Sequence, residues 1–456
     1  MKSKNYKQFW KLGKKEFNTE QFDMNTDGEL VVREGNYQYN IYDLARKFDS
    51  SIKVFMPSVL EQRLSHLIET FTGTIKTQKY KGKFTYHFPM KVNQNKEFVL
   101  PLVAEGAHLE VTSANELWVV KKMWEGENFH SKIRILCNGP KTVQYLKLIQ
   151  YLEDKNLTIT PIIETLNEAE LLKDFKGERG VRLNMDIKVS SHWDKKIDRF
   201  GLTPEEALSL GKVRNLKVLH YHLGSQIGNE NDIIIALREA FKIYVKLRQL
   251  NPTLDTLDVG GGLAISYQKK KMYRMESVVK RIVSTLYDLS EKAGVPHPNI
   301  ITEWGQYIAA PSQFTVFKVI DTKDIPKGVA QKWYIIDGSF MTDLLDTWAI
   351  HQKWHVIPVN HMAAPKKERV WLAGLTCDSD DKYADADGHV LLPRFSDLAP
   401  GEDMFIAVLD TGAYQDAFSM HHCLISSPAK IVLQNGLVTV ARKRESPEEI
   451  GKLFGW

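Results

Sequence analysis

The sequence has little cysteine, little net charge and no long apolar run. Its three cysteines, Cys137, Cys377 and Cys423, form no CxxC pair, so we expect neither a disulfide framework nor a structural zinc site. An odd and sparse set of cysteines is typical of proteins in a reducing compartment. We therefore expect a cytoplasmic protein.

The lack of concentrated charge and of long apolar segments argues against two further classes of protein. Lys and Arg number 61 and Asp and Glu 56, which gives a net charge of +5 over 456 residues. The basic residues form no long stripe that could follow a nucleic acid. No apolar stretch approaches about 18 residues, so no membrane-spanning segment is expected. The basic N-terminal residues are not followed by an apolar segment, which argues against a secretory signal.

What remains is an ordinary globular composition, with 43% apolar and 26% charged residues. From about residue 41, short β-rich runs alternate with helical patterns. The runs that predict strands are 84–90, 108–112, 133–137, 157–163, 180–183, 218–223, 256–259 and 299–304. This alternation predicts parallel strands joined by crossover helices, and the number of strands predicts an α/β fold of the (β/α)8 TIM barrel type. A doubly wound open sheet is the alternative.

Two other regions are β-rich. Residues 28–40 predict a short hairpin, because the turn signal Glu34-Gly35-Asn36 separates two strand-like runs. After about residue 312, β-rich runs separated by Gly, Pro and Asp predict a mainly β C-terminal domain, which the N-terminal hairpin is expected to join. The expected organisation is a lead-in and hairpin over 1–40, a barrel over 41–311 and a β domain over 312–456.

Polar groups follow several of the predicted barrel strands. They are Lys91, His222, Ser225, the three glycines 260–262 and Glu303. Because the carboxyl ends of barrel strands share one rim, these groups are expected to lie together. Each has a structural alternative when taken singly: a rim lysine, a core histidine, a tight turn or a rim carboxylate. Together they suit pyridoxal phosphate (PLP), which needs an amine for its aldehyde, backbone N–H groups for its phosphate and an acid for its ring nitrogen.

Five motifs, in this order, resemble those of the fold type III (alanine-racemase-like) PLP-dependent decarboxylases. They are FPMKVNQ (88–94), HLGSQ (222–226), DVGGG (258–262), TCDSD (376–380) and GAYQ (412–415). Within that group the chain is most similar to the biosynthetic arginine decarboxylases, a similarity to which ILCNG (135–139) also contributes. The resemblance covers roughly residues 40–435 and implies PLP as the cofactor.

The resemblance implies a role for each residue of the cofactor site. Lys91 is the Schiff-base lysine, His222 stacks on the cofactor ring, and Glu303 pairs with the pyridinium nitrogen. Glu110 and Arg182 lie around the lysine and the ring. The residues implied to contact the phosphate are Ser225, Gly260, Gly261, Gly262, Gly305 and Tyr414.

The resemblance also implies residues that act on the substrate. Cys377 is the acid that returns a proton to Cα after CO2 leaves, and a thiol with its usual pKa of about 8.5 still holds that proton at neutral pH. Asp378 binds the distal cationic end of the substrate, and Asp346 is a further candidate. The acids Asp378, Asp380 and Asp381 argue against the alternative that Cys377 is a buried core cysteine. The Cys377–Asp378 segment reaches the partner subunit's site in the family, which implies a homodimer with active sites at the interface.

The chain departs from the family pattern after the last predicted barrel strand. The usual Glu-Pro/Ser-Gly-Arg appears here as EWGQ (303–306). Gln306 in place of arginine removes a charged phosphate contact, so cofactor binding is expected to depend more on the glycine turn, Ser225 and Tyr414. Trp304 is expected to add bulk near the ring edge. The chain also has little room for the inserted helical segment and C-terminal extension of longer arginine decarboxylases.

The predicted function is PLP-dependent decarboxylation of a basic L-amino acid, with arginine, converted to agmatine in polyamine biosynthesis, as the first candidate. Ornithine, lysine, diaminopimelate or a carboxylated polyamine stays open as the substrate. An amino-acid racemase is an alternative, but it needs a second base facing Lys91 and no Cys–Asp pair. A non-catalytic decarboxylase-like regulator is another, although such proteins typically lack the lysine or the cysteine.

Overall fold

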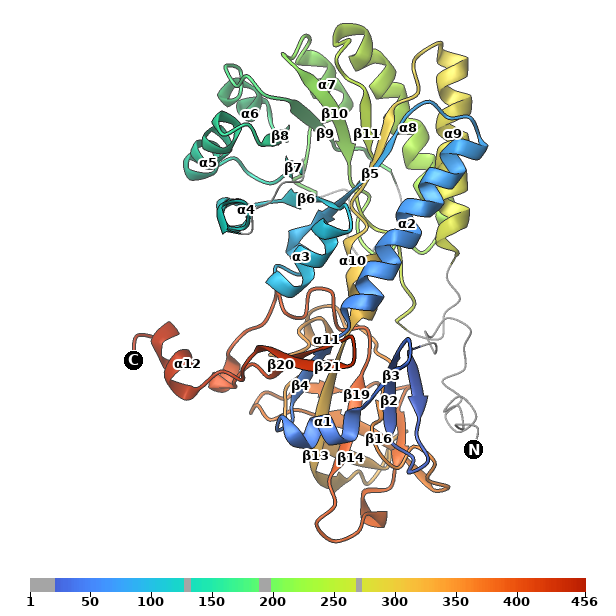
Figure 1. The fold of residues 1–456 in the computed structure, drawn as a ribbon, viewed down its shortest axis with the longest axis vertical. Coiled ribbons are helices and arrows are strands. Elements are labelled where there is room, and N and C mark those ends of the chain that lie inside the picture. The colour runs from blue at the N-terminus through green and yellow to red at the C-terminus, as the bar shows by residue number, and fades with distance from the viewer. Residues whose placement is uncertain (1–20, 127–132, 188–197, 268–272) are drawn as a thin grey trace. The chain divides into compact units, whose positions relative to one another are not determined.

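The computed structural model describes most of the chain, namely residues 21–126, 133–187, 198–267 and 273–456. Residues 1–20 of the predicted lead-in lie outside the described residues. The chain divides into two compact units (Figure 1). The barrel unit contains the described residues of Glu61–Ile265 and Met272–Ile308, and the β unit those of Met1–Leu60, Ser266–Lys271 and Ala309–Trp456.

The barrel unit is built on a closed barrel of parallel strands that follow one another around it in chain order. The strands are β5 (Phe84–Pro89), β6 (His108–Val111), β7 (Arg134–Cys137), β8 (Thr158–Ile163), β9 (Arg179–Leu183), β10 (Leu216–Tyr221), β11 (Thr256–Asp258) and β12 (Asn299–Thr302). Each predicted run overlaps one of them. The pairing of β12 with β5 closes the sheet, which confirms the (β/α)8 barrel and excludes the open sheet.

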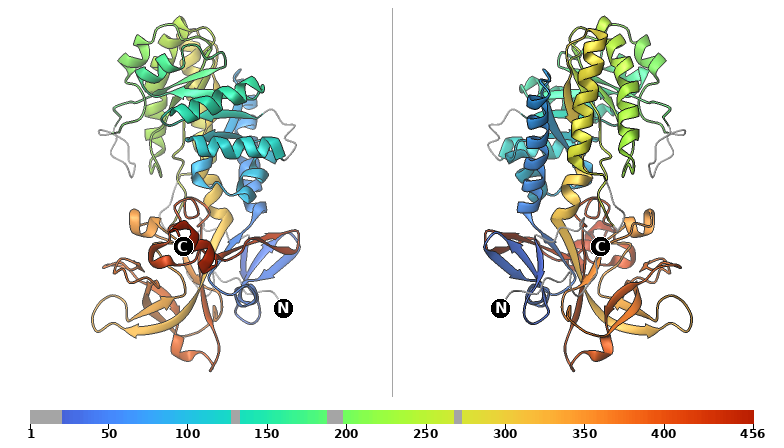
Figure 2. Two further views of the ribbon diagram at one scale, coloured as in Figure 1. Left: turned by 90° about the vertical axis from the view of Figure 1, so that its left-hand side faces the viewer. Right: turned by 90° about the vertical axis from the view of Figure 1, so that its right-hand side faces the viewer.

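Helices cover the outside of the barrel. They are α2 (Pro57–Thr77), α3 (Lys96–Ala104), α4 (Ala114–Gly126), α5 (Val143–Asp154), α6 (Leu166–Leu171), α7 (Pro204–Ser209), α8 (Glu230–Leu250), α9 (Met275–Ala293) and α10 (Gly305–Ala309). The right-hand view of Figure 2 shows α2, α9 and α8 side by side. Ion pairs join them, His66 to Glu276 at 3.1 Å and Arg281 to Glu230 at 3.0 Å. Among the described residues, no helix is both long enough and apolar enough to cross a membrane.

Apolar side chains from the strands fill the core of the barrel unit. Leu136, Ile162, Val218 and Ile301 form a fully buried cluster contributed by four different strands. Burial of each such side chain contributes roughly 1.5–3 kcal/mol relative to exposure. This packing fixes the strands and therefore the positions of the residues at their ends.

The β unit contains a mainly antiparallel sheet with the strand order β17-β16-β14-β13-β4-β20-β21, to which β15, β18 and β19 add. The strands are β4 (Ile52–Phe55), β13 (Gln313–Asp324), β14 (Lys332–Ile336), β15 (Val356–Pro358), β16 (Lys367–Ala373), β17 (Lys382–Tyr383), β18 (Val390–Pro393), β19 (Met404–Val408), β20 (Ala429–Gln434) and β21 (Leu437–Arg442). Its helices are α1 (Ile41–Lys47), α11 (Asp346–Ala349) and α12 (Pro447–Leu453).

The N-terminal strands also belong to the β unit. β1 (Phe22–Met24), β2 (Leu30–Glu34) and β3 (Tyr37–Asn40) form a separate three-stranded antiparallel sheet. The predicted hairpin is β2–β3, and its turn contains Gly35 at a φ of +55°. β4 pairs with β13 on one side and β20 on the other. The barrel unit therefore begins after Leu60, later than the expected start at residue 41, because β4 is buried in the β sheet.

Candidate cofactor site

The polar residues predicted in the barrel lie at or just after the carboxyl ends of its strands. They are Lys91 after β5, Glu110 in β6, Arg182 in β9, His222 and Ser225 after β10, the glycines 260–262 after β11, and Glu303 and Gly305 after β12. Because every strand pair in the barrel is parallel, these positions share one end of the barrel.

Lys91 faces a buried carboxyl group. It lies in η2 (Met90–Val92), the 3-10 turn that follows β5, and its Nζ is 3.7 Å from Oε2 of Glu110. The lysine side chain is 37% exposed and that of Glu110 is fully buried. Burial raises the pKa of Glu110 to about 7; the nearby Lys91 opposes this shift and Glu303 adds to it. The amine thus lies at the accessible end of an otherwise buried polar cluster.

Glu303 is a buried carboxylate held by two neighbours. Asn138 donates from Nδ2 to Oε1 of Glu303 at 3.3 Å and to Oε1 of Glu110 at 2.9 Å, so it bridges the two carboxyl groups. Nε2 of His220 lies 3.5 Å from Oε2 of Glu303. Burial opposes the charge of Glu303, but His220, followed by Lys91 and His222, outweighs burial and holds its pKa below the usual value. Glu303 is therefore ionised at neutral pH.

Asp258 is a second buried carboxyl group, at the end of β11. Its Oδ1 accepts a hydrogen bond from the backbone N–H of Gly260 at 2.9 Å. Burial, reinforced by the charge of Glu303, raises the pKa of Asp258 well above its usual value. Since two close buried carboxyl groups cannot both ionise at low cost, Asp258 is protonated and Glu303 carries the charge.

The glycines after β11 form a turn that no side chain could occupy. Gly260 has a φ of +65°, and a Cβ there would lie 2.3 Å from the carbonyl oxygen of Tyr221. A Cβ at Gly261 would lie 3.0 Å from Nε2 of His222, so the imidazole borders this turn. Successive backbone N–H groups in such a turn can bind an anion.

Gln306 contacts a neighbouring serine. Ser225 donates its hydroxyl hydrogen bond to Oε1 of Gln306 at 3.0 Å. This contact joins the segment after β10 to α10, beside the glycine turn. The expected placement of Trp304 near the ring edge is not what the structure shows. Trp304 is buried with its ring 5.8 Å from that of Phe71 in α2, because it faces the helical layer.

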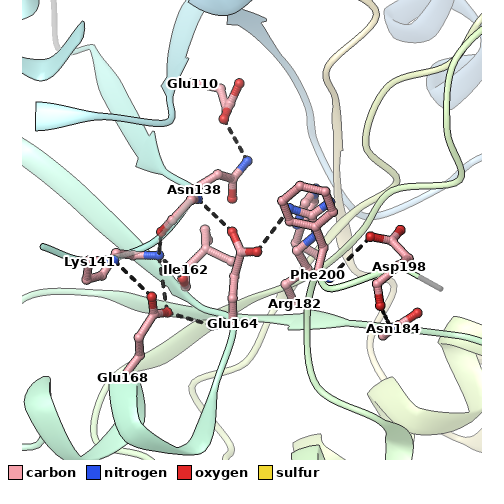
Figure 3. A network of polar contacts seen from close by, with 12 residues as sticks. Glu110, Asn138, Lys141, Ile162, Glu164, Glu168, Arg182, Asn184, Asp198 and Phe200 are labelled. Atoms are coloured by element: carbon pink, nitrogen blue, oxygen red, sulfur yellow. Dashed lines mark hydrogen bonds and ion pairs between the residues drawn. The ribbon is translucent and has the colours of Figure 1, made fainter. Parts of the chain in front are cut away.

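A buried network supports Arg182 (Figure 3). Nη1 of Arg182 donates to Oε2 of Glu164 at 3.2 Å, and its guanidinium lies 4.6 Å from the ring of Phe200. Oε1 of Glu164 accepts from the N–H of Gly139 at 2.6 Å. The two carboxylate oxygens of Glu164 thus join the loop after β7 to β9.

Lys141, in the loop after β7, extends this network to Glu168 (Figure 3). Its buried Nζ donates to the carbonyl oxygen of Gly139 at 2.7 Å and lies 3.4 Å from Oε2 of Glu168. Burial lowers the pKa of Lys141, although Glu168 and Glu164 oppose that shift. Glu168 in turn accepts from the N–H of Glu164 at 2.8 Å. These contacts position Glu164, and through it Arg182.

Cys377 lies in the β unit on an exposed loop, with its Sγ 3.6 Å from Sγ of Cys423. The hydrogen bond with Cys423 raises the pKa of Cys377, so the thiol holds its proton at neutral pH. Asp381 is buried, unlike the exposed acid that the sequence suggested. Its carboxylate accepts from the N–H groups of Phe340 at 2.7 Å and Thr376 at 3.0 Å, which fixes the loop. Asp378 is half-buried and accepts from the N–H of Asp380 at 2.8 Å.

Tyr414 and Asp346 also lie in the β unit. Tyr414 has a φ of +67°, and the next residue, Gln415, donates to Oδ2 of the buried Asp346 at 2.8 Å. Asp346 therefore anchors the segment that contains Tyr414. Its expected contact with substrate stays a prediction.

Sequence reasoning missed several polar residues of the barrel mouth. They are Asn138, Glu164, His220 and Asp258. Each lies in or just after a predicted strand, and Asn138 and Asp258 are part of motifs already singled out. Their position at strand ends was a usable signal, but their pairing depends on barrel closure.

Comparison with known proteins points to the pyridoxal-dependent decarboxylases. The family model for the pyridoxal binding domain of pyridoxal-dependent decarboxylases matches residues 67–310. A biosynthetic arginine decarboxylase of Bacteroides thetaiotaomicron is 29% identical in an alignment of 344 positions that covers 68% of this chain and 54% of that protein. One from Alkalilimnicola ehrlichii is 25% identical in an alignment of 486 positions that covers 80% of this chain and 77% of that protein. The chain thus spans about half the length of the first of these relatives.

Two solved structures share the fold. The biosynthetic arginine decarboxylase of Campylobacter jejuni matches with a TM-score of 0.80 and 20% identity, covering 94% of this chain and 89% of that one. The diaminopimelate decarboxylase of M. jannaschii matches with a TM-score of 0.81 and 21% identity, covering 94% and 96%.

The matched domain binds pyridoxal, so the cofactor is pyridoxal 5′-phosphate. The barrel residues fit this group. Among the described residues, several buried oxygen atoms near the strand ends have no hydrogen-bond partner, and they include Oε2 of Glu110 and Oδ1 of Asn138. The side-chain-free glycine turn and an accessible amine complete a polar site of the kind that the cofactor needs.

Proposed function

The chain belongs to the family of pyridoxal-dependent decarboxylases, and on this premise we propose that it decarboxylates a basic L-amino acid, with arginine first. The observation that carries the proposal is the buried, ionised Glu303 at the end of the barrel that also presents Lys91. An ionised acid here can keep a ring nitrogen protonated, which is the state that accepts electrons from Cα.

The barrel residues have distinct proposed roles towards the cofactor. When bound, pyridoxal phosphate supplies an aldehyde that condenses with amines and a ring that withdraws electrons. Lys91 holds the cofactor through its amine, Glu303 accepts a hydrogen bond from the protonated ring nitrogen, and His222 stacks on the ring. Glu110 and Arg182 orient the lysine and the ring. The proposed phosphate contacts are Ser225, Gly260, Gly261, Gly262, Gly305 and Tyr414.

Residues of the β unit have proposed roles towards the substrate. Cys377 donates a proton to Cα once CO2 has left, and its raised pKa supports that role because the thiol stays protonated at neutral pH. Asp378 binds the cationic end of the substrate, and Asp346 is a second candidate. On this proposal the barrel unit binds the cofactor, and the β unit supplies the proton donor and substrate contacts.

Arginine ranks first because relatives that are 25–30% identical are named biosynthetic arginine decarboxylases. A panel of arginine, ornithine, lysine, diaminopimelate and carboxylated polyamines, with CO2 release as the readout, tests the proposal. We expect the fastest release from arginine and, in Cys377→Ala, a loss of about 10²-fold or more, the usual size of a proton-transfer contribution. Formation of a D-amino acid without CO2 release would indicate a racemase and contradict the proposal.

We further propose a cytoplasmic homodimer that acts in polyamine biosynthesis, in which Cys377 of one copy serves the barrel of the other. The free cysteines suit a reducing compartment. Lys91→Ala and Cys377→Ala, each inactive alone, should regain about a quarter of the wild-type activity after equal mixing, because half of the dimers then hold one complete site. Mixed dimers without activity would contradict shared sites.

A further inference from the structure

Two cysteines and a histidine from separate segments of the β unit meet at one place. They are Cys377, His422 and Cys423, and one ligand atom from each lies within 4.8 Å of the other two. The cysteines lie 46 residues apart in the chain, so sequence spacing alone gave no sign of the cluster. Nε2 of His422 is buried and has no hydrogen-bond partner among the described residues. Thiolates and imidazole are the ligands that zinc prefers.

The separation of the sulfur atoms suits a shared metal ion. Two thiolates bound to one tetrahedral zinc at about 2.3 Å lie roughly 3.8 Å apart. The Sγ atoms of Cys377 and Cys423 are 3.6 Å apart, whereas a disulfide would bring them to about 2.0 Å. The pair therefore lies near zinc-binding geometry without a rearrangement of its backbone.

Both segments that supply the ligands are fixed by other contacts. Asp381 holds the Cys377 loop through the N–H groups of Phe340 and Thr376. The segment with His422 and Cys423 is held next to these residues, where Nε2 of His421 lies 2.9 Å from Oε2 of Glu445. Oε2 of Glu445 also accepts from the N–H of Ser427 at 2.8 Å. Ligands held in this way lose little freedom when a metal binds, which favours binding.

We propose that Cys377, His422 and Cys423 bind a zinc ion, with the fourth position open to water, and that this zinc inhibits the enzyme reversibly. Binding converts both thiols to thiolates and releases two protons to solvent, while no group is oxidised or reduced. Cys377 then has no proton to give. The inhibitory part of this inference rests on the proposed role of Cys377 as proton donor; the binding of zinc does not.

Cobalt(II) titration of the full-length, cofactor-loaded protein under reducing conditions tests the site itself. Four-coordinate cobalt with thiolate ligands absorbs strongly in the red, away from the cofactor. In the wild type we expect this absorption to saturate at one equivalent of cobalt per chain and to disappear when zinc displaces the cobalt. In Cys423→Ser we expect the absorption to be lost. Cys137→Ala is the matched control, because Cys137 is buried elsewhere, and should retain the signal. Absence of the signal in the wild type would overturn the inference, as would equal signal in Cys423→Ser.

CO2 release measured with and without zinc tests the inhibition. We expect zinc to inhibit the wild type and a chelator to restore it. Compared at equal fractional inhibition of its own zinc-free rate, Cys423→Ser should need at least about tenfold more zinc than the wild type, since loss of outer-shell partners alone costs that much affinity. Inhibition that is equal in both proteins would contradict the inference. Failure of the proposed function would give a different result from failure of the zinc site. No substrate would then release CO2, with or without zinc, but the cobalt absorption would persist.

Discussion

Glu303 and Asp258 are two buried carboxyl groups at neighbouring strand ends, and they differ in charge. His220 and Asn138 contact Glu303, which stays ionised, whereas Asp258 accepts from the N–H of Gly260 and is protonated beside the charge of Glu303. Of these two carboxyl groups, Glu303 therefore carries a fixed negative charge and Asp258 does not. That arrangement suits a ligand that carries one positive charge on a ring.

Glu110 gives the pH dependence that follows most directly from a single residue. Its pKa is raised to about 7 by burial, against about 4.3 for an unfolded glutamate. Between these values the folded chain binds more protons than the unfolded chain, so stability falls as pH rises through this window. Relative to Glu110→Gln, the cofactor-free wild type should lose up to about 3 kcal/mol of unfolding free energy between pH 4 and pH 7.5.

Urea unfolding of both proteins at a series of pH values measures this difference. The comparison with Glu110→Gln isolates one titration, because all other groups are common to both proteins. Parallel pH profiles would show that Glu110 ionises normally in the folded chain.

The sequence allowed single residues to be predicted where a strand end coincided with a motif, as for Lys91 and Glu303. It could not reveal that Asn138 bridges Glu110 and Glu303, because that contact depends on closure of the barrel, which brings the ends of β6, β7 and β12 together. The charge states were equally inaccessible, since they depend on burial. The burial of Asp381, against expectation, reflects its use as an acceptor for backbone N–H groups.

At the scale of elements, the turn after β11 imposes the strictest local requirement. Gly260 combines a positive φ with a carbonyl oxygen 2.3 Å from where a Cβ would lie. Gly260→Ala should therefore destabilise the protein by about 2 kcal/mol or more and weaken cofactor binding. Gly73 in α2 has nothing within 4 Å of such a Cβ, so Gly73→Ala should be neutral or stabilising by up to about 1 kcal/mol.

Thermal or urea unfolding, with cofactor titration, measures both variants. Equal stability of Gly260→Ala and Gly73→Ala would contradict the turn geometry described here.

The barrel strands were predictable as elements because alternating β-rich and helical runs are local patterns. β4 could not be predicted in this way. It has four residues and precedes a long helical pattern, and the strands that pair with it, β13 and β20, lie much later in the chain. The separate sheet of β1–β3 was likewise beyond local pattern, although its hairpin turn was predicted.

At the scale of the whole molecule, a buried ion cluster ties the N-terminal part of the β unit to its C-terminal part. Nζ of Lys53 in β4 lies 2.7 Å from Oδ1 of Asp416, and Nζ of Lys430 in β20 lies 2.6 Å from Oδ2. All three side chains are buried. Burial opposes the charge of Asp416, but Lys430 and Lys53 hold its pKa well below the usual value.

Asp416→Asn should cost about 3–5 kcal/mol of unfolding free energy, because it leaves two buried ammonium groups without a counter-charge. Asp403→Asn is the matched control. Its ion pair with Lys318 is partly exposed, so its loss should cost about 1 kcal/mol or less. The stability that Asp416 confers is present above about pH 4 and is lost on acidification, since its pKa is lowered by folding. Similar costs for both variants in urea unfolding would contradict the role of the buried cluster.

The most direct test of the account is to locate the cofactor on the chain. Wild-type protein loaded with pyridoxal phosphate is reduced with borohydride, digested and mapped by mass spectrometry, with Lys91→Ala treated in parallel. We predict that the cofactor is found on the peptide with Lys91, and on none in the variant. Attachment to another lysine, or an equal yield in both proteins, would contradict the assignment of Lys91 and the site built around it.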